Sequence, residues 1–148
     1  MRGGGWLLDT NVVSELTRPR PHPGVVAWLG ARDEADLHVS VLTLGEIERG
    51  VAALPPDHPS RPRHAAHLAA FAARFAGRVL PVDAAVARRW GAICGPRRRA
   101  TGAWPPVVDS LLAAQAIEAG LTLATRNTRD VAGLGAAVFD PWTGEAVG

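Results

Sequence analysis

Residues 6–11 read WLLDTN, a short apolar run that ends in a carboxylate and two small polar residues. The run predicts a buried strand, and the spacing of apolar residues in 12–16 predicts that a helix follows it. Asp9 would then lie where a strand passes into a helix. Ligands of open α/β sheets bind at this carboxyl edge, so Asp9 is a candidate for chemistry. The alternative is that Asp9 only caps the helix.

Composition bounds the class of protein. The chain has 148 residues, of which 47% are hydrophobic, and this predicts a single domain over residues 1–148 with a substantial core. No apolar run reaches the roughly 20 residues that a membrane span needs, and the first residues lack a signal-peptide pattern. We therefore expect a soluble, cytoplasmic protein that does not associate with a membrane.

The charged residues indicate a kind of partner. All 16 basic residues are arginine, so mechanisms that need an active-site lysine are excluded. The planar arginine side chain suits phosphate, which favours nucleic acid as a partner, although a GC-rich genome would give the same bias. Cys94 is the single cysteine; it excludes an internal disulfide and predicts a small core residue in an apolar helix.

Short apolar segments alternate with amphipathic ones along the rest of the chain. After the first strand, the pattern predicts strands at 37–40, 79–82, 121–125 and 137–139, followed by a tail at 140–142. It predicts helices at 25–30, 41–54, 65–75, 83–99 and 107–119. This alternation is typical of βαβ units. We expect an α/β fold with a mostly parallel central sheet covered on both faces.

Three acids stand out by their positions: Asp9 after the first strand, Glu46 early in a helix, and Asp109 in the first turn of another. Strand ends and helix starts meet at one edge of a parallel sheet, so these acids can converge. Clustered carboxylates need a cation, and Mg²⁺ or Mn²⁺ takes such oxygen ligands and pairs with phosphate. Periodicity alone does not choose between Glu46 and Glu48.

Four segments resemble the PIN-domain ribonucleases, specifically the VapC-type toxins of bacterial toxin–antitoxin pairs. They are LLDTNVVSEL at 7–16, SVLTLGEIERG at 40–50, VVDSLLAAQAIEAGLTLATRN at 107–127 and AVFDPW at 137–142, in the order and spacing of the family. The resemblance implies a PIN-like α/β/α sandwich and a Mg²⁺- or Mn²⁺-dependent endoribonuclease. It also implies a homodimer and a small VapB-type antitoxin that inhibits the enzyme and binds DNA.

Carried over residue by residue, the resemblance assigns the metal-binding and catalytic acids. Asp9, Glu46 and Asp109 match the three acids of the family, and this match favours Glu46 over Glu48. Thr10 and Asn11 match the small polar pair that orients the first acid or the waters of the metal. The implied reaction is hydrolysis of an RNA phosphodiester by an activated water.

The fourth acidic position of the family departs from the pattern. Members commonly have an aspartate directly after Thr-Arg, where this chain has Asn127. An amide offers a neutral acceptor in place of a charge, so the number of metal ions stays open. Asp130, three residues later, is the alternative fourth residue, or else an ordinary acid of a helix start.

Arginines near these segments are candidates for holding RNA phosphates. They are Arg126, Arg129 and the run Arg97, Arg98 and Arg99. The run also lies at the end of a predicted helix, where the macrodipole stabilises cations without any ligand.

The antitoxin of the implied pair needs a binding surface. Members of the family often receive an antitoxin segment that places an arginine beside the acids. We expect here a groove lined by Val12, Leu16 and the second and third predicted helices.

Other classes fit the chain less well. Haloacid-dehalogenase phosphatases and response-regulator receiver domains also place an acid after the first strand, but both use a lysine that this chain lacks. A catalytically impaired PIN-fold protein that only binds RNA or protein is the remaining alternative. Asn127 favours that alternative, and the three matching acids oppose it.

Overall fold

The computed structural model describes residues 4–147. The strands are β1 (Trp6–Leu8), β2 (Leu37–Ser40), β3 (Val79–Leu80), β4 (Thr122–Ala124), β5 (Val138–Asp140) and β6 (Glu145–Val147). The helices are α1 (Thr10–Glu15), α2 (Pro23–Gly30), α3 (Val41–Ala53), α4 (Arg61–Arg74), α5 (Ala84–Thr101), α6 (Val107–Ala119) and α7 (Thr128–Val131), with a 3-10 turn at Glu34–Asp36.

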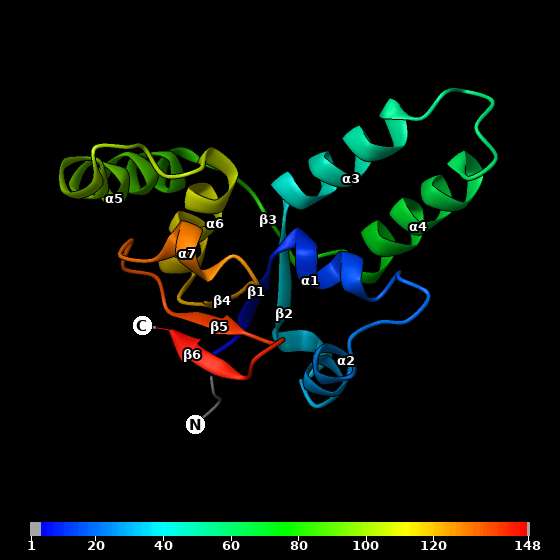
Figure 1. Cartoon of the computed structure of the whole chain (residues 1–148), viewed down its shortest axis with the longest axis horizontal. Coiled ribbons are helices and arrows are strands. Elements are labelled where there is room, and N and C mark those ends of the chain that lie inside the picture. The colour runs from blue at the N-terminus through cyan, green and yellow to red at the C-terminus, as the bar shows by residue number, and fades with distance from the viewer. Residues whose placement is uncertain (1–3, 148) are drawn as a thin grey trace.

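The strands form one six-stranded sheet in the order β3-β2-β1-β4-β5-β6 (Figure 1). β1 lies in the interior of the sheet and pairs in parallel with β2 and β4. Within residues 4–147, β6 is the one antiparallel strand, and it pairs with β5. The predicted α/β fold with a mostly parallel sheet is confirmed.

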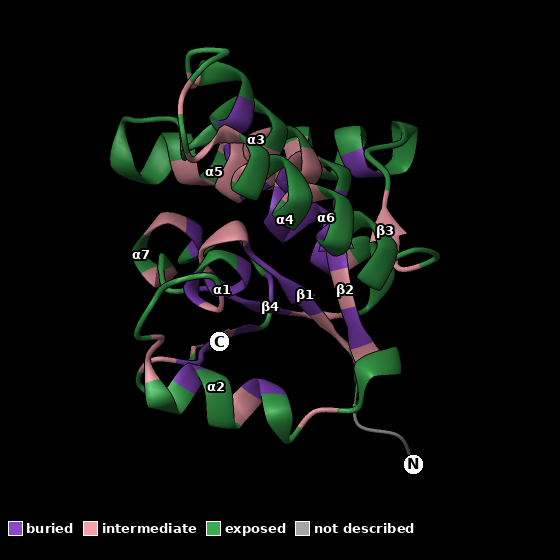
Figure 2. Ribbon diagram, turned by 90° about the vertical axis from the view of Figure 1, so that its right-hand side faces the viewer, coloured by how far each residue is buried: buried purple, intermediate pink, exposed green. Residues whose placement is uncertain are grey.

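Two apolar clusters lie on opposite faces of this sheet. Leu8 belongs to the cluster covered by α1, α2 and α4, whereas Leu7 belongs to the cluster covered by α6 and α7. Successive side chains of a strand point to opposite faces, so β1 contributes to both clusters. Figure 2 shows the buried strands between the helical layers. The fold is therefore the expected α/β/α sandwich.

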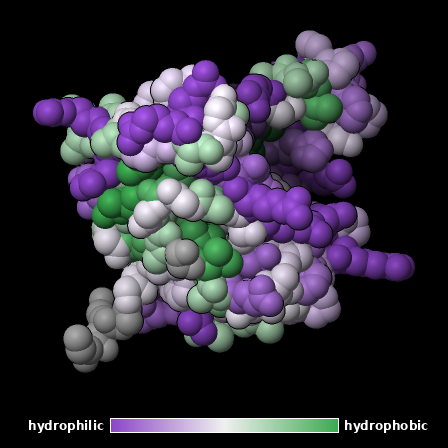
Figure 3. Space-filling view, turned by 60° about the vertical axis from the view of Figure 1, so that its left-hand side comes forward, coloured by the Kyte–Doolittle hydropathy of each residue, from purple (hydrophilic) through white to green (hydrophobic). Residues whose placement is uncertain are grey.

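Two pairs of helices pack against each other. α3 and α4 form a hairpin at the upper right of Figure 1, and α5 packs along α6 at the upper left. A space-filling view from the left shows an apolar area bordered by hydrophilic side chains (Figure 3). No helix among residues 4–147 combines the length and the apolar character that a membrane span requires.

Several predicted helix boundaries differ from the structure: α2 begins at Pro23 rather than at residue 25, and α4 and α5 also differ. The helix predicted at 65–75 begins earlier, at Arg61, because Pro62 is accepted in the first turn, where its missing N–H is not needed. The helix predicted to end near Arg99 continues to Thr101. It stops at Gly102, whose φ of 78° is accessible to glycine at little cost.

The prediction that the chain ends in a tail after residue 139 is wrong. Asp140 Oδ1 accepts a hydrogen bond from Trp142 N at 2.8 Å, and Gly144 turns the chain with a φ of 76°. β6 then pairs with β5 at the edge of the sheet. Its sequence, Glu-Ala-Val, is too short and too polar to show a strand pattern.

Truncation of a core side chain on β4 tests the packing. Leu123 is fully buried, so we expect Leu123→Ala to lower the free energy of unfolding by about 2–5 kcal/mol, through lost apolar burial and a residual cavity. Urea denaturation at equilibrium measures this change. Val26→Ala is the matched control because Val26 is 43% exposed, and a loss of similar size in that variant would contradict the assignment of the core.

Candidate active site

Asp9 lies directly after β1, at the carboxyl edge of the sheet. Its residue occupies the N-cap position of α1, but its side chain makes no capping hydrogen bond. The carboxylate accepts a hydrogen bond from Thr125, so capping is not its only role. Its backbone N–H donates to Ala124 O at 2.9 Å, which continues the pairing of β1 with β4. Asp9 is 6% exposed, which is unusual for a carboxylate.

Thr125 holds the carboxylate of Asp9 in place. Leu8 pairs with Ala124 in the sheet, so the residues that follow the two strands lie side by side. Thr125 Oγ1 donates to Asp9 Oδ2 at 2.7 Å and accepts from Asn127 N at 3.0 Å. Thr125 is fully buried. Thr125 was not among the predicted site residues. Its position at the end of a predicted strand could have identified it.

Asn11 adds a weaker contact to the same group. Its Nδ2 lies 3.4 Å from Asp9 Oδ2 and 3.4 Å from Thr125 Oγ1. Its Oδ1 is buried and has no hydrogen-bond partner within residues 4–147. A buried acceptor without a donor is costly, and a cation would satisfy it.

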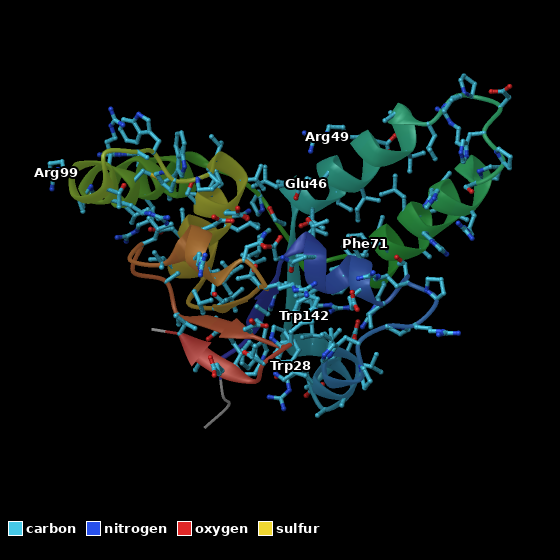
Figure 4. The ribbon with its side chains drawn as sticks, viewed as in Figure 1. Trp28, Glu46, Arg49, Phe71, Arg99 and Trp142 are labelled. Atoms are coloured by element: carbon cyan, nitrogen blue, oxygen red, sulfur yellow. The ribbon has the colours of Figure 1, made fainter. Side chains whose placement is uncertain are left out.

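Glu46 reaches the site from α3. Ser40 caps this helix by accepting a hydrogen bond from Leu42 N at 3.0 Å, which fixes its start at the end of β2. Thr10 Oγ1 donates to Glu46 Oε1 at 2.7 Å. Figure 4 shows Glu46 near the base of α3, above α1. Glu48, the other candidate on this helix, is exposed.

Asp109 lies in the first turn of α6, and its pKa is raised to about 6. Burial is the main cause, followed by the negative charges of Asp9, Asp130 and Glu46. The side chain of Asn127 lowers the pKa in part by hydrogen bonding. The structure thus brings together the three predicted acids and both candidates for the fourth position.

Burial also raises the pKa of Asp9, and the charge of Glu46 adds to this effect. The hydrogen bond from Thr125 and the N–H groups of Thr10 and Asn11 act against it. None of the ion pairs found within residues 4–147 involves Asp9, Glu46 or Asp109. The acids therefore repel one another without a compensating cation from the described part of the chain.

The chemistry of these donors fits a hard divalent cation. Carboxylate oxygens and the orphaned amide oxygen of Asn11 are the ligands that Mg²⁺ and Mn²⁺ prefer. Among the described residues, no group of three His, Cys, Asp or Glu side chains is arranged closely enough to hold a metal ion.

Three of the five predicted RNA-binding arginines lie on α7 or beside it. The guanidinium of Arg97 donates to the backbone carbonyls of Arg129 and Asp130, so it ties α5 to the helix that carries them. Arg129 itself is exposed. Arg126 lies over the ring of Trp142, with 5.2 Å between its Cζ and the ring centroid.

The other two arginines lie farther along α5. Arg98 donates to Gly102 O and covers the ring of Trp104, with its Cζ 5.6 Å from the centroid. Arg99 lies at the far end of α5 in Figure 4, away from Glu46. The structure does not bring Arg99 to the acids.

The groove expected along Val12, Leu16 and the second and third helices lies elsewhere. Val12 is fully buried in the core and cannot line a groove. A cavity of about 390 Å³ instead lies between α1, α3 and α4, so α4 replaces α2. Its apolar wall consists of Val13, Ile47, Val51, Leu54 and Phe71, and Glu46 also lines it. The helical phase of α1 explains the error, because it turns Val13 rather than Val12 to this side.

A parallel sheet with acids at its carboxyl edge places the protein among the α/β proteins that bind ligands at this edge. The chain belongs to the PIN-domain family, whose model matches residues 6–133. It is 38% identical over 136 residues to toxin FitB of Neisseria gonorrhoeae, covering 92% of this chain and 97% of FitB. The resemblance found in the sequence is confirmed.

Two further comparisons agree with this assignment. The chain is 31% identical over 136 residues to VapC ribonuclease Y4jK of Sinorhizobium fredii, covering 92% of this chain and 96% of that protein. A solved structure of FitAB bound to an IR36 DNA fragment has a TM-score of 0.83 and 36% identity, covering 93% of this chain and 95% of the compared chain.

The raised pKa of Asp109 predicts a pH dependence of stability. Its pKa is about 6 in the folded protein against an ordinary value of 3.8, so the folded state holds a proton that the unfolded chain releases between these values. The resulting contribution to the free energy of unfolding is fully present below pH 3.8 and is lost as the pH rises through about 6. In protein freed of divalent metal, we expect Asp109→Asn to remove this loss.

Urea denaturation of wild type and variant between about pH 4 and pH 7 measures the difference. Asp57→Asn is the control, because Asp57 is an exposed acid on the loop between α3 and α4. If Asp109→Asn keeps the whole pH dependence of the wild type, the raised pKa does not belong to Asp109.

Proposed function

We propose that this protein is the toxin of a toxin–antitoxin pair and acts as a Mg²⁺- or Mn²⁺-dependent endoribonuclease. The observation that carries the proposal is the buried carboxylate of Asp9, held by Thr125 beside Asp109 and Glu46. The similarity to toxin FitB and to VapC ribonuclease Y4jK supports the same function.

Asp9 and Asp109 would hold the metal ion, with Glu46 binding it directly or through water. When bound, such an ion supplies polarisation of the phosphodiester and activation of water. Thr125 keeps Asp9 in one orientation, and Thr10 does the same for Glu46. Side chains oriented in advance need less rearrangement when the substrate binds.

Two residues share the role of the family's fourth acid. Asn127 supplies a hydrogen bond to Asp109, and Asp130 supplies a negative charge near it. We propose that Asp130 provides the fourth charge of the site and that Asn127 orients Asp109. Arg126, Arg129 and Arg97 are nearest to these groups and are the arginines that we propose for RNA phosphates.

The cavity between α1, α3 and α4 is the proposed binding place for a VapB-type antitoxin. Its apolar wall suits an apolar segment, and Glu46 in its lining suits an arginine that reaches the acids. A homodimer is also proposed, by similarity to the family.

Cleavage of RNA tests the main proposal. We expect the antitoxin-free protein to cut total RNA when Mg²⁺ or Mn²⁺ is present and not in chelator. Asp9→Asn and Asp109→Asn should each lower the rate by about 100-fold or more, because each removes a charge that holds the ion. Gel analysis of the products measures the rate.

Asp57→Asn again serves as the control, and it should cut RNA like the wild type. Circular dichroism should show that every variant is folded. Folded wild-type protein that binds RNA but cuts none with either metal would favour the binding-only alternative.

Removal of one hydroxyl tests how Asp9 is positioned. Thr125→Val keeps the side-chain shape but loses the hydrogen bond of 2.7 Å to Asp9. Groups that orient a metal ligand contribute roughly 10- to 100-fold to metal affinity or activity, and we expect a loss in this range. Calorimetric titration with Mn²⁺ measures the affinity independently of RNA.

Thr125→Ser restores the hydroxyl and should recover most of the Mn²⁺ affinity. Equal affinity in Thr125→Val and the wild type would mean that Thr125 has no positioning role.

A further inference from the structure

We propose that Trp104 and the arginines of α5 form a docking surface for single-stranded RNA, in which an unpaired base stacks on Trp104. The inference rests on the proposed function, since it assigns the place where substrate binds outside the acidic site. We call this surface the Trp104 platform and define it by Trp104, Val107, Arg98 and Arg99.

Trp104 is held in an exposed position by its surroundings. Gly102 ends α5 in the left-handed conformation and the chain turns back toward the start of α6. Arg98 fixes this turn by donating to Gly102 O, and its guanidinium covers the Trp104 ring. Trp104 nevertheless remains 65% exposed, and Val107 is 60% exposed. A large aromatic ring that faces solvent is available for a partner.

A hollow lies next to Trp104. It has a volume of about 420 Å³ and lies between α5 and residues 104–107. Its lining is almost wholly apolar and consists of Trp90, Gly91, Cys94, Trp104, Pro105 and Val107. Stacking uses the face of a base and therefore suits such a surface.

Charge on α5 favours a phosphate backbone as the partner. The helix carries five arginines and no acid: Arg88, Arg89, Arg97, Arg98 and Arg99. Arg89 pairs with Glu118, whereas no ion pair of the other four is found within residues 4–147. Arginines beside an exposed aromatic ring are typical of surfaces for single-stranded nucleic acid.

The platform connects to the acidic site through two elements. Val107 begins α6, and Asp109 lies in the first turn of the same helix. Arg97 holds the backbone of Arg129 and Asp130 from the side of α5. An RNA strand can therefore contact the platform while its scissile phosphate lies near Asp109.

A second copy of this chain fits the platform less well. Closed dimers bring the same patch of both subunits together. Such a contact would place Arg98 and Arg99 near their own copies, and like charges repel in an interface. A duplex also fits poorly, because its bases are not free to stack on a side chain.

RNA binding without cleavage tests the inference. The probe is a fluorescent oligouridine of about 12 nucleotides in chelator, with anisotropy as the readout. We expect Trp104→Ala to raise the Kd by about 5- to 150-fold, since stacking on an aromatic side chain contributes about 1–3 kcal/mol per base. Trp104→Phe keeps an aromatic face and should stay within about threefold of the wild type.

Arg99→Gln tests the charge at the platform independently of Trp104. We expect it to weaken binding and to reduce the dependence of log Kd on log salt by about 0.7, the value for one lost phosphate contact. Arg20→Gln is the matched control, because Arg20 is an exposed arginine on the opposite loop between α1 and α2, and it should leave the Kd unchanged.

Two results of the binding and light-scattering measurements would overturn the inference. One is a Kd of Trp104→Ala within twofold of the wild type. The other is light scattering that shows a wild-type dimer and a Trp104→Ala monomer, which would make the platform a subunit contact. Failure of the proposed function gives a different result. If RNA binds through Trp104 but is never cut, the proposed nuclease activity is wrong and the platform is supported. If metal-dependent cleavage is unaffected by Trp104→Ala, the platform is wrong and the nuclease activity is supported.

Discussion

The hydrogen bond from Thr125 to Asp9 across the carboxyl ends of β1 and β4 is the interaction on which the site depends. Burial of a carboxylate is costly, and this bond of 2.7 Å lowers the cost while it fixes the direction of the oxygens. The bond exists because Leu8 pairs with Ala124 in parallel register. A shift of this register by one residue would turn Thr125 to the other face and separate the pair.

The fold follows from the sequence where an element carries a regular pattern of apolar residues. The strands around 6–8 and 37–40 and the helices with apolar spacing lie where they were predicted, because burial on one or both faces imposes a period. β6 lacks such a pattern, since it is a three-residue edge strand that needs β5 beside it. Tertiary pairing, not local preference, determines it.

The site residues also differ in how far the sequence alone predicts them. Asp9 and Asp109 were predicted from their positions at a strand end and a helix start, which the local sequence pattern indicates. Glu46 and Glu48 differ by two positions on one helix, and the bond from Thr10 that distinguishes them spans 36 residues. Thr125 was not predicted, because its hydrogen-bond partner Asp9 lies 116 residues away in the sequence.

The distribution of charge relates the two functional surfaces. RNA is an anion, and the acids at the sheet edge repel it until a cation neutralises them. α5, with five arginines and no acid, has a charge that would attract RNA whether or not a cation is bound. Because Arg97 couples α5 to α7, the attractive surface is fixed relative to Asp130. Binding energy gained along α5 is thus available to bring a phosphate to a site that would not attract it alone.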